Sequence, residues 1–251
     1  MFRVKRSGAI AISNCVSMFH RTPQSGIRIL SYHSIGSVVT GDVNGLYSLS
    51  PSEFHMHVDA IQEFSSKFSV PIVPFGSKEA NGIVFSFDDG YLDALSIVAP
   101  TLSEKNIPFH VFVSPENALG GDKRYLAPLD LVELQKIPGA TIGAHGNSHV
   151  SLTSLDEATM EAELHESKIS LEQILQVPVT TMSYPFGGVS EVVRNTAERV
   201  GFTQAACSKW GFVQQNTDRL MQPRVDIWKH DSKRVYLQKV SGQWNWFSKI
   251  T

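Results

Sequence analysis

Runs of hydrophobic residues alternate along this chain with longer segments in which hydrophobic residues recur every three or four positions. The runs predict seven β-strands, starting near residues 27, 83, 108, 141, 180, 203 and 223. The segments between them predict helices, among them 91–104, 128–136, 154–175 and 190–200. Such an alternation is typical of a parallel sheet, and seven strands suffice to close it, or nearly close it, into a barrel. The predicted fold class is therefore α/β, a (β/α)7 barrel in a single domain.

Capping residues predict where two of the helices begin. Ser50 and Ser154 are each followed three positions later by a glutamate, which is typical of a helix N-terminus. In the helix that Ser50 opens, the hydrophobic residues lie on one face. His55 and His57 fall outside this face, so we expect both to face solvent.

Composition narrows the class of protein. The 251 residues are 42% hydrophobic and 18% charged, as in a globular chain with a sizeable core. A net charge of −2 without a basic run gives no electrostatic reason to expect a nucleic-acid partner. Cys15 and Cys207 lack the spacing of a metal site. Two free thiols in a reducing compartment are favoured over a disulfide, which the sequence alone leaves open.

Residues 1–26 are interpreted as a leader helix or tail, and residues 27–251 as the barrel, with a C-terminal extension from about residue 231. The leader carries Arg3, Lys5 and Arg6 and then an apolar stretch that polar residues interrupt, which favours a weakly amphipathic helix on a membrane surface over a cleaved signal peptide. No later segment is long enough to cross a bilayer. We therefore expect a cytoplasmic location or contact with the cytoplasmic membrane face, with export as the alternative.

Two adjacent carboxylates, Asp88 and Asp89, follow the hydrophobic strand that starts at residue 83. Burying both costs free energy unless a cation compensates them, and a divalent metal is the obvious one. Neighbouring strand residues point to opposite sides, so one carboxylate can bind a metal while the other faces the substrate as a base. The alternative is a plain turn, for which Asp-Asp-Gly is equally suitable.

A pair of histidines follows another predicted strand. His145 and His149 lie four residues apart, so their rings can meet at one point if the segment coils by one helical turn. With one carboxylate they form a metal site that leaves positions open for water and substrate. A parallel barrel gathers such residues at the carboxyl ends of its strands, where His33, Arg224 and Asp226 are also expected.

The motifs Ser86-Phe87-Asp88-Asp89-Gly90 and His145-Gly146-Asn147-Ser148-His149 resemble those of the polysaccharide deacetylases of carbohydrate esterase family 4. The resemblance covers about residues 27–230. Members of this family are metal-dependent enzymes with a distorted seven-stranded barrel, and they remove acetyl groups from N-acetylated sugars. The resemblance implies that Asp88 is the catalytic base and that Asp89, His145 and His149 hold one divalent metal. Zinc fits these ligand types best.

A third family motif, Arg-x-Pro-Tyr, is altered here to Ser183-Tyr184-Pro185-Phe186. The resemblance implies that Tyr184 and Pro185 contact substrate and that the backbone N–H of Phe186 helps to bind the oxyanion. Ser183 stands where the family has the arginine that orients the base. Arg224 is our candidate to replace that arginine.

The acid histidine of most relatives lies near the C-terminus, yet no histidine follows His230 here. Some relatives, including the biofilm poly-N-acetylglucosamine deacetylases, are circularly permuted and carry it in an N-terminal Tyr-His segment, which Tyr32-His33 resembles. The resemblance implies that His33 is the general acid, that Asp226 supports it and that Trp228 forms a wall of the acetyl pocket. A closed barrel would place the last strand beside the first. The alternative for His33 is a buried histidine at a strand end.

The implied reaction is hydrolysis of the N-acetyl group of a sugar or oligosaccharide, in a glycan or in a glycan precursor that could be lipid-linked, with a metal-bound water as the nucleophile. Two other functions stay open at this point. One is a catalytically weak, sugar-binding relative, suggested by Ser183. The other is a hydrolase of a different acyl group or C–N bond, because acyl selectivity depends on pocket walls that the sequence does not place.

Overall fold

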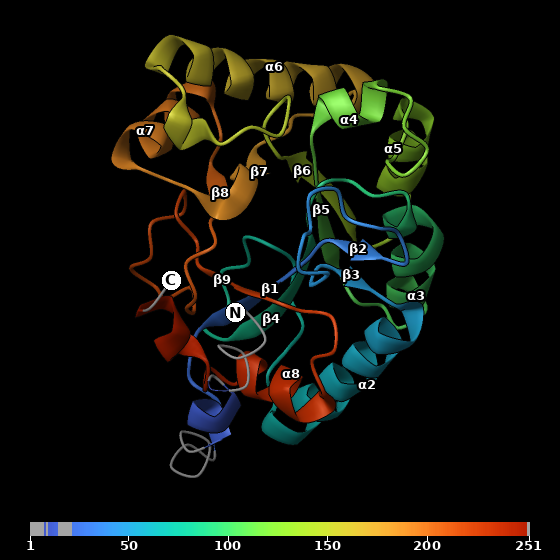
Figure 1. The fold of residues 1–251 in the computed structure, drawn as a ribbon, viewed down its shortest axis with the longest axis vertical. Coiled ribbons are helices and arrows are strands. Elements are labelled where there is room, and N and C mark those ends of the chain that lie inside the picture. The colour runs from blue at the N-terminus through green and yellow to red at the C-terminus, as the bar shows by residue number, and fades with distance from the viewer. Residues whose placement is uncertain (1–7, 9, 15–21, 250–251) are drawn as a thin grey trace.

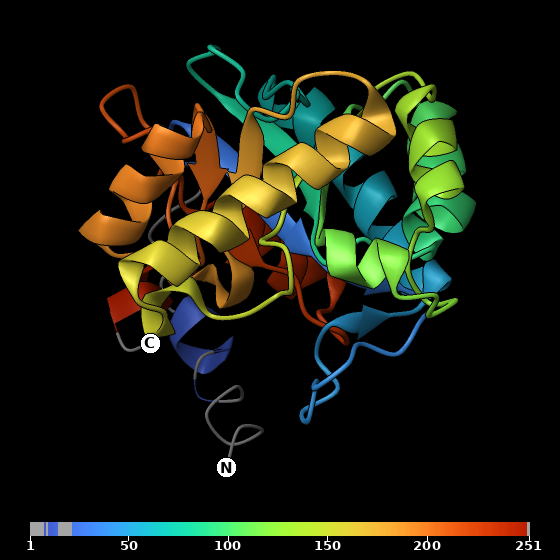
Figure 2. The same ribbon diagram turned by 90° about the horizontal axis from the view of Figure 1, so that it is seen from above.

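The computed structural model describes residues 8, 10–14 and 22–249. Its centre is a sheet of seven parallel strands in the order β8-β7-β6-β5-β4-β1-β9, surrounded by helices (Figures 1 and 2). The strands are β1 (Ile27–Tyr32), β4 (Gly82–Phe87), β5 (Phe109–Val113), β6 (Ala140–Ala144), β7 (Thr181–Ser183), β8 (Gln204–Ala206) and β9 (Arg224–Asp226). The predicted seven-stranded parallel α/β fold in one domain is confirmed.

The two edge strands, β8 and β9, nearly close the sheet into a barrel. An isolated parallel bridge joins Ala206 to Gln222, just before β9, and the backbone N–H of Gln222 donates to the carbonyl of Ala205 at 2.9 Å. On its other side, β9 pairs with β1, with Ser31 opposite Asp226. The expectation that the last strand lies beside the first is therefore confirmed.

Strands β1 and β4 form the centre of the barrel and are buried along their whole length. Both faces of such strands are covered, which is why most of their residues are hydrophobic. They pair in register from Ile27 opposite Gly82 to Tyr32 opposite Phe87. The backbone N–H of Asp88 also donates to the Tyr32 carbonyl at 2.9 Å, so the acidic pair begins beside the residue that precedes His33.

Helices and two short strands complete the chain. The longer helices are α2 (Pro51–Phe68), α5 (Pro128–Gln135), α6 (Glu157–Leu175), α7 (Glu191–Val200) and α8 (Lys233–Val240). The shorter ones are η1 (Ala94–Val98), α3 (Ala99–Ser103), α4 (Pro115–Leu119), η2 (Leu152–Ser154), η3 (Pro185–Gly187) and η4 (Asn245–Lys249). A two-stranded sheet pairs β2 (Ser34–Ile35) with β3 (Ser48–Leu49).

Two predicted helices begin or run differently in the structure. The helix predicted over 91–104 is present from residue 93 to residue 103 but is irregular: the π-helical segment η1 runs directly into α3, and Pro100 has no N–H to continue the regular hydrogen bonds. The cap at Ser154 is wrong. Asp156 caps α6 instead, accepting a hydrogen bond from the Thr159 N–H at 2.9 Å, while Ser154 ends a short 3-10 turn.

His57 is buried, contrary to the prediction that it faces solvent, whereas His55 is exposed as expected. The His57 ring stacks on Tyr236 with 4.0 Å between ring centroids. This contact arises because α8, from the end of the chain, packs against α2 (Figure 1). The hydrophobic pattern of α2 alone could not reveal a partner that lies almost 180 residues away in sequence.

The described part of the leader, residues 10–14, is helical and contacts the C-terminal segment. The Trp246 indole donates to the Ser13 hydroxyl at 3.1 Å, and the Gln238 amide donates to Asn14 at 2.9 Å. Arg3, Lys5, Arg6 and Cys15 lie outside the described residues. The domain boundaries and the membrane contact of the leader stay predictions.

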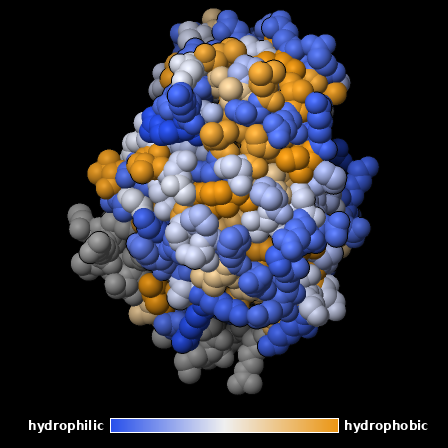
Figure 3. Space-filling model, turned by 90° about the vertical axis from the view of Figure 1, so that its right-hand side faces the viewer, coloured by the Kyte–Doolittle hydropathy of each residue, from blue (hydrophilic) through white to orange (hydrophobic). Residues whose placement is uncertain are grey.

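Among the described residues, none of the helices has both the length and the apolar composition to traverse a bilayer. On the face of the molecule shown in Figure 3, hydrophobic and hydrophilic residues alternate over the surface.

Arg28, in β1, ties the first strand to the C-terminal segment. Its guanidinium is buried and donates to the carbonyls of Gly211 at 2.6 Å and Val240 at 3.4 Å, and to the Asn245 side chain at 2.8 Å. It also lies 3.5 Å from the centre of the Phe212 ring. Charged donors shared among several buried acceptors stabilise a structure more than surface pairs do.

We predict that Arg28→Met lowers the free energy of unfolding by about 3 kcal/mol, because it leaves buried acceptors without a donor. Lys105→Met is the matched control, since it removes only a surface pair with Asp59 at 3.4 Å and should cost about 1 kcal/mol or less. Urea denaturation of both variants measures the difference. Equal losses in the two variants would contradict the role given to Arg28.

Candidate active site

A cavity of about 350 Å³ opens at the carboxyl ends of the barrel strands. The predicted site residues that line it are His33, Asp88, Asp89, His145, His149, Phe186 and Asp226. A larger cavity of about 520 Å³ lies beside Ile27 and Gln204, at the amino ends of β1 and β8, and contains none of them. The smaller cavity is therefore the candidate site, as expected for a parallel barrel.

Asp89, His145 and His149 converge on one point. The Nε2 atoms of His145 and His149 lie 3.3 Å and 3.1 Å from Oδ1 of Asp89. One ligand atom from each residue lies within 4.8 Å of the others. The segment from 145 to 149 reaches this arrangement as a loop rather than by the expected helical turn, with His149 in the left-handed region at φ 55°.

Neighbouring groups orient the two histidines. The Nδ1–H of His145 donates to the Ser183 carbonyl at 2.9 Å, which leaves the lone pair of Nε2 directed at Asp89. The loop that leads to His149 is held by Glu163 of α6, which accepts hydrogen bonds from the backbone N–H groups of Asn147 at 2.9 Å and Ser148 at 3.1 Å. The first hydrogen bond fixes the orientation of the His145 ring, and the other two fix the loop that carries His149, before a metal binds.

The Asp89 carboxylate suits a divalent cation. Burial disfavours its charged form, but the neighbouring imidazoles of His145 and His149 outweigh burial and hold the pKa of Asp89 well below its ordinary value. Oδ1 is buried and faces the two imidazole nitrogens. An ionised oxygen and two imidazole lone pairs in reach of one point match the ligand set of a catalytic metal with open positions.

Asp88 forms a separate unit beside this cluster. Both of its oxygens accept hydrogen bonds from the Arg224 guanidinium, each at 2.7 Å, and both side chains are almost fully buried. Burial favours the neutral acid, but the charge of Arg224 outweighs it and lowers the pKa of Asp88. The Ser183 hydroxyl lies 3.4 Å from the same carboxylate. The guanidinium that pairs with Asp88 therefore comes from Arg224, because residue 183 is a serine here.

Comparison with known proteins identifies the family. The model of the polysaccharide deacetylase family matches residues 76–205, which contain the acidic pair and both histidines. The chain belongs to the polysaccharide deacetylase family. This family consists of metal-dependent enzymes that remove acetyl groups from N-acetylated carbohydrate, so the predicted enzyme class and the general substrate class are confirmed, and the donor set fits a divalent metal whose identity is a separate question.

Relatives and solved structures extend the match beyond this range. YxkH of Bacillus subtilis (strain 168), named for the same family, is 23% identical over 205 residues, 79% of this chain and 70% of that protein. Chitin deacetylase 1 of Cryptococcus neoformans is 29% identical over 118 residues, 47% of this chain and 24% of that enzyme.

The fold is shared with solved deacetylase structures. The Streptococcus pyogenes deacetylase PplD, solved with acetate, superposes with a TM-score of 0.71 at 19% identity, covering 87% of this chain and 99% of that chain. IcaB from Ammonifex degensii gives 0.68 at 17% identity, covering 89% and 98%.

In this polysaccharide deacetylase, His33 and Asp226 lie in the same cavity, outside the range of the family match. The His33 ring lies 4.4 Å from the Tyr47 ring, and its Nδ1 is buried without a hydrogen-bond partner among the described residues. Burial raises the pKa of Asp226, while the charges of His33, Arg224 and Lys239 favour its ionised form. The two residues are close enough to interact electrostatically, and their catalytic roles stay proposals.

Phe186 lies at the rim of the cavity. Its backbone is left-handed at φ 56°, and its ring is 68% exposed and 4.7 Å from the His149 ring. The following Gly187 is also left-handed, at φ 70°, and a Cβ there would come within 1.8 Å of the Ser208 hydroxyl. The turn therefore requires glycine and places residue 186 beside the metal ligands.

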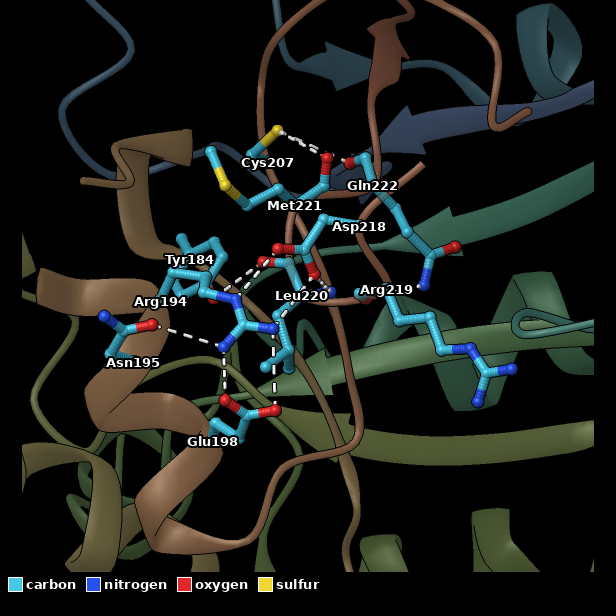
Figure 4. A network of polar contacts seen from close by, with 10 residues as sticks. All are labelled: Tyr184, Arg194, Asn195, Glu198, Cys207, Asp218, Arg219, Leu220, Met221 and Gln222. Atoms are coloured by element: carbon cyan, nitrogen blue, oxygen red, sulfur yellow. Dashed lines mark hydrogen bonds and ion pairs between the residues drawn. The ribbon is translucent and has the colours of Figure 1, made fainter. Parts of the chain in front are cut away.

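The three predicted substrate contacts are placed differently. Neighbouring strand residues face opposite sides, so Ser183 points to Asp88 while Tyr184 points away from the cavity. The Tyr184 hydroxyl donates to the Leu220 carbonyl at 2.8 Å, next to the Arg194–Asp218 ion pair (Figure 4). A direct substrate contact for the Tyr184 side chain is therefore wrong.

Pro185 and Trp228 are also buried rather than part of the cavity lining. Pro185 packs against Gly146, where an added Cβ would meet it at 3.0 Å. Trp228 packs in an aromatic cluster with Trp210, Trp244 and Phe247. Both residues contribute to the packing around the site and not to its lining.

The sequence did not reveal three features of the site. Tyr47 and the loop 40–44 line the cavity, and Glu163 binds the loop that carries His149.

We predict that Asp89→Ala weakens Zn²⁺ binding by about 100-fold or more, because it removes the carboxylate from the set of three ligands. Asp88→Asn should bind Zn²⁺ with an affinity close to that of the wild type, since Asp88 is engaged by Arg224. Isothermal titration with Zn²⁺ compares the variants. Equal affinity in both variants would show that the ligand set is different.

Proposed function

We propose that the chain is a metal-dependent hydrolase that removes N-acetyl groups from an N-acetylated sugar in a glycan or a glycan precursor, with Asp88 as the base and His33 as the acid. The observation that carries the proposal is the placement of a buried carboxylate, paired with Arg224, beside the Asp89, His145 and His149 cluster in one open cavity.

The donor set suits zinc, because imidazole and carboxylate ligands with open positions are typical of catalytic zinc sites. Asp89, His145 and His149 would hold this ion, which would supply Lewis-acid polarisation of the acetyl carbonyl and would lower the pKa of a bound water towards neutrality. The family match and the geometry support a metal; zinc is our choice among the divalent ions.

Asp88 supplies the proton acceptor. The two Arg224 hydrogen bonds fix the plane of its carboxylate and keep it ionised, so its remaining lone pairs can take a proton from the attacking water. Without the guanidinium, a carboxylate buried this deeply would favour its neutral form, which cannot accept a proton.

The chain offers two further groups for the later steps. The backbone N–H of Phe186, on the turn that precedes Gly187, is our candidate to stabilise the tetrahedral oxyanion, a contribution of about 3 kcal/mol for one such donor. His33 then donates a proton to the departing amine, which is a poor leaving group without it. Asp226, which lines the same cavity, is our candidate to support His33 in this role.

The position of His33 near the N-terminus, directly after the strand that pairs with β9, supports a circularly permuted subgroup like the poly-N-acetylglucosamine deacetylases. The fold shared with IcaB is consistent with this grouping. We propose a lipid-linked or nucleotide-linked sugar as substrate and a location in the cytoplasm or at the cytoplasmic membrane face, with finished polymer and export as the alternative. The polar residues that interrupt the apolar stretch of the leader, Ser13, Asn14 and Ser17, are the reason for preferring the cytoplasmic location, because they are untypical of a signal peptide.

The case for a catalytically weak, sugar-binding relative depends on Ser183. The ion pair of Arg224 with Asp88 supplies the charge that Ser183 lacks, so the structure favours the enzyme. Hydrolysis of a different acyl group or C–N bond is retained as an outcome of the test below.

We predict that the Zn²⁺-loaded chain releases acetate from N-acetylglucosamine oligomers and that Asp88→Asn lowers kcat by about 10²–10⁴-fold while metal is retained. Asp59→Asn is the matched control, since this exposed aspartate of α2 lies outside the cavity, and it should keep full activity. Enzymatic detection of acetate measures the rate.

Binding of the oligomers without acetate release under any divalent metal would favour the sugar-binding alternative. Release of formate or ammonia from other amides, but not of acetate, would assign a different C–N bond.

A further inference from the structure

Lys239, in α8, has its ammonium group completely buried. Its partner Asp231 is buried to the same extent, and Nζ lies 2.6 Å from Oδ2 of that carboxylate. Burying two charges costs several kcal/mol each, and apolar residues of similar volume are often as stabilising. Such a pair therefore calls for a reason other than stability, and its contacts indicate one.

The ammonium of Lys239 closes the segment from Asp226 to Asp231 into a turn. Nζ donates to the backbone carbonyl of Asp226 at 2.9 Å and lies 3.7 Å from the centre of the Trp228 ring. The Asp231 carboxylate accepts a hydrogen bond from Lys239. It also accepts one from the backbone N–H of Trp228 at 3.0 Å. One cation thus binds the beginning, the middle and the end of this segment.

The same segment carries a carboxylate that lines the cavity together with His33, the proposed acid. Asp226 is the last residue of β9, it pairs with Ser31 of β1, and its side chain lines the cavity together with His33. The next residue, Ile227, donates its N–H to the Ser31 carbonyl at 3.0 Å. Strand pairing fixes one side of Asp226, and Lys239 holds its carbonyl on the other.

We propose that Lys239 is a positioning residue for the acid half of the reaction: it holds the Asp226 backbone and the Trp228 ring so that the Asp226 carboxylate stays directed at His33. This inference rests on the proposed function, in which His33 protonates the departing amine. Lys239 does not line the cavity and acts only through Asp226 and Trp228.

The charges around Asp226 agree with this role. Burial raises the pKa of Asp226, His33, Arg224 and Lys239 favour its ionised form, and Asp88 opposes it. Both terminal nitrogens of Arg224 bind Asp88. Lys239 therefore contributes a positive charge on the side of Asp226 that lies away from the cavity.

The test compares two substrates that differ in their need for an acid. Acetate release from an N-acetylglucosamine oligomer requires protonation of the amine, whereas 4-nitrophenyl acetate expels a stable phenolate without it. The variants are His33→Gln, Lys239→Met and the double variant Lys239→Met with Asp231→Asn, all loaded with Zn²⁺. Lys233→Met is the matched control, because it removes an exposed lysine of the same helix, paired with Glu63 at 2.6 Å.

We expect Lys239→Met to lose about 100-fold in kcat on the oligomer, as for a small displacement of a catalytic group, with ester hydrolysis close to that of the wild type. His33→Gln should show the same selective loss, and Lys233→Met should show neither. Zn²⁺ affinity should be unchanged in all variants, because no ligand of the metal is altered.

The double variant separates positioning from folding. Removing both charges should recover most of the melting temperature that Lys239→Met loses, because the amide oxygen of Asp231→Asn can still accept from the Trp228 backbone N–H, while the carbonyl of Asp226 still lacks its donor. We therefore expect the amide-selective loss to persist in a stable protein. Recovery of oligomer turnover together with stability would overturn the inference.

Equal loss of both activities in Lys239→Met and in the double variant would also overturn it, since a general structural role would produce that result. If the wild type hydrolyses the ester but releases no acetate from the oligomer, the proposed function fails, and the positioning role fails with it.

Discussion

The site depends on one buried ion pair, which joins Arg224 of β9 to Asp88 at the end of β4. The two residues are 136 positions apart in sequence, and β1 lies between their strands in the sheet. Such a pair repays the cost of removing two charges from water only when its geometry is good, and here both carboxylate oxygens accept at 2.7 Å. The place of β9 beside β1 and the ionised state of Asp88 are therefore linked.

Other buried charges near this pair also have partners of opposite sign. Arg224 balances Asp88, Lys239 balances Asp231, and Asp226 lies between the two cations. The local backbone then separates the roles of the acidic pair: the left-handed conformation of Asp89, at φ 71°, turns its side chain to the histidines while Asp88 is held by Arg224. Adjacent carboxylates can thus carry different functions because each has its own counter-charge.

The sequence predicts what depends on local pattern. The seven strands, the capped start of α2 and the acidic pair at a strand end could all be read from hydrophobic runs, a capping box and turn residues. What it could not supply was contact between distant segments. His57 is buried by α8, Glu163 reaches the histidine loop from α6, and Tyr184 faces the segment before β9, none of which has a signal within its own element. The π-helical irregularity inside the helix predicted at 91–104 has a local cause, the proline at position 100.

The central claim is that one cation is held by Asp89, His145 and His149, with Asp88 left outside the metal site and beside it. A crystal structure of the Zn²⁺-loaded protein tests it most directly. The account predicts zinc at about 2.0–2.2 Å from one oxygen of Asp89 and from Nε2 of both histidines, with Asp88 still paired to Arg224. Zinc bound by Asp88, or bound without one of the two histidines, would contradict it.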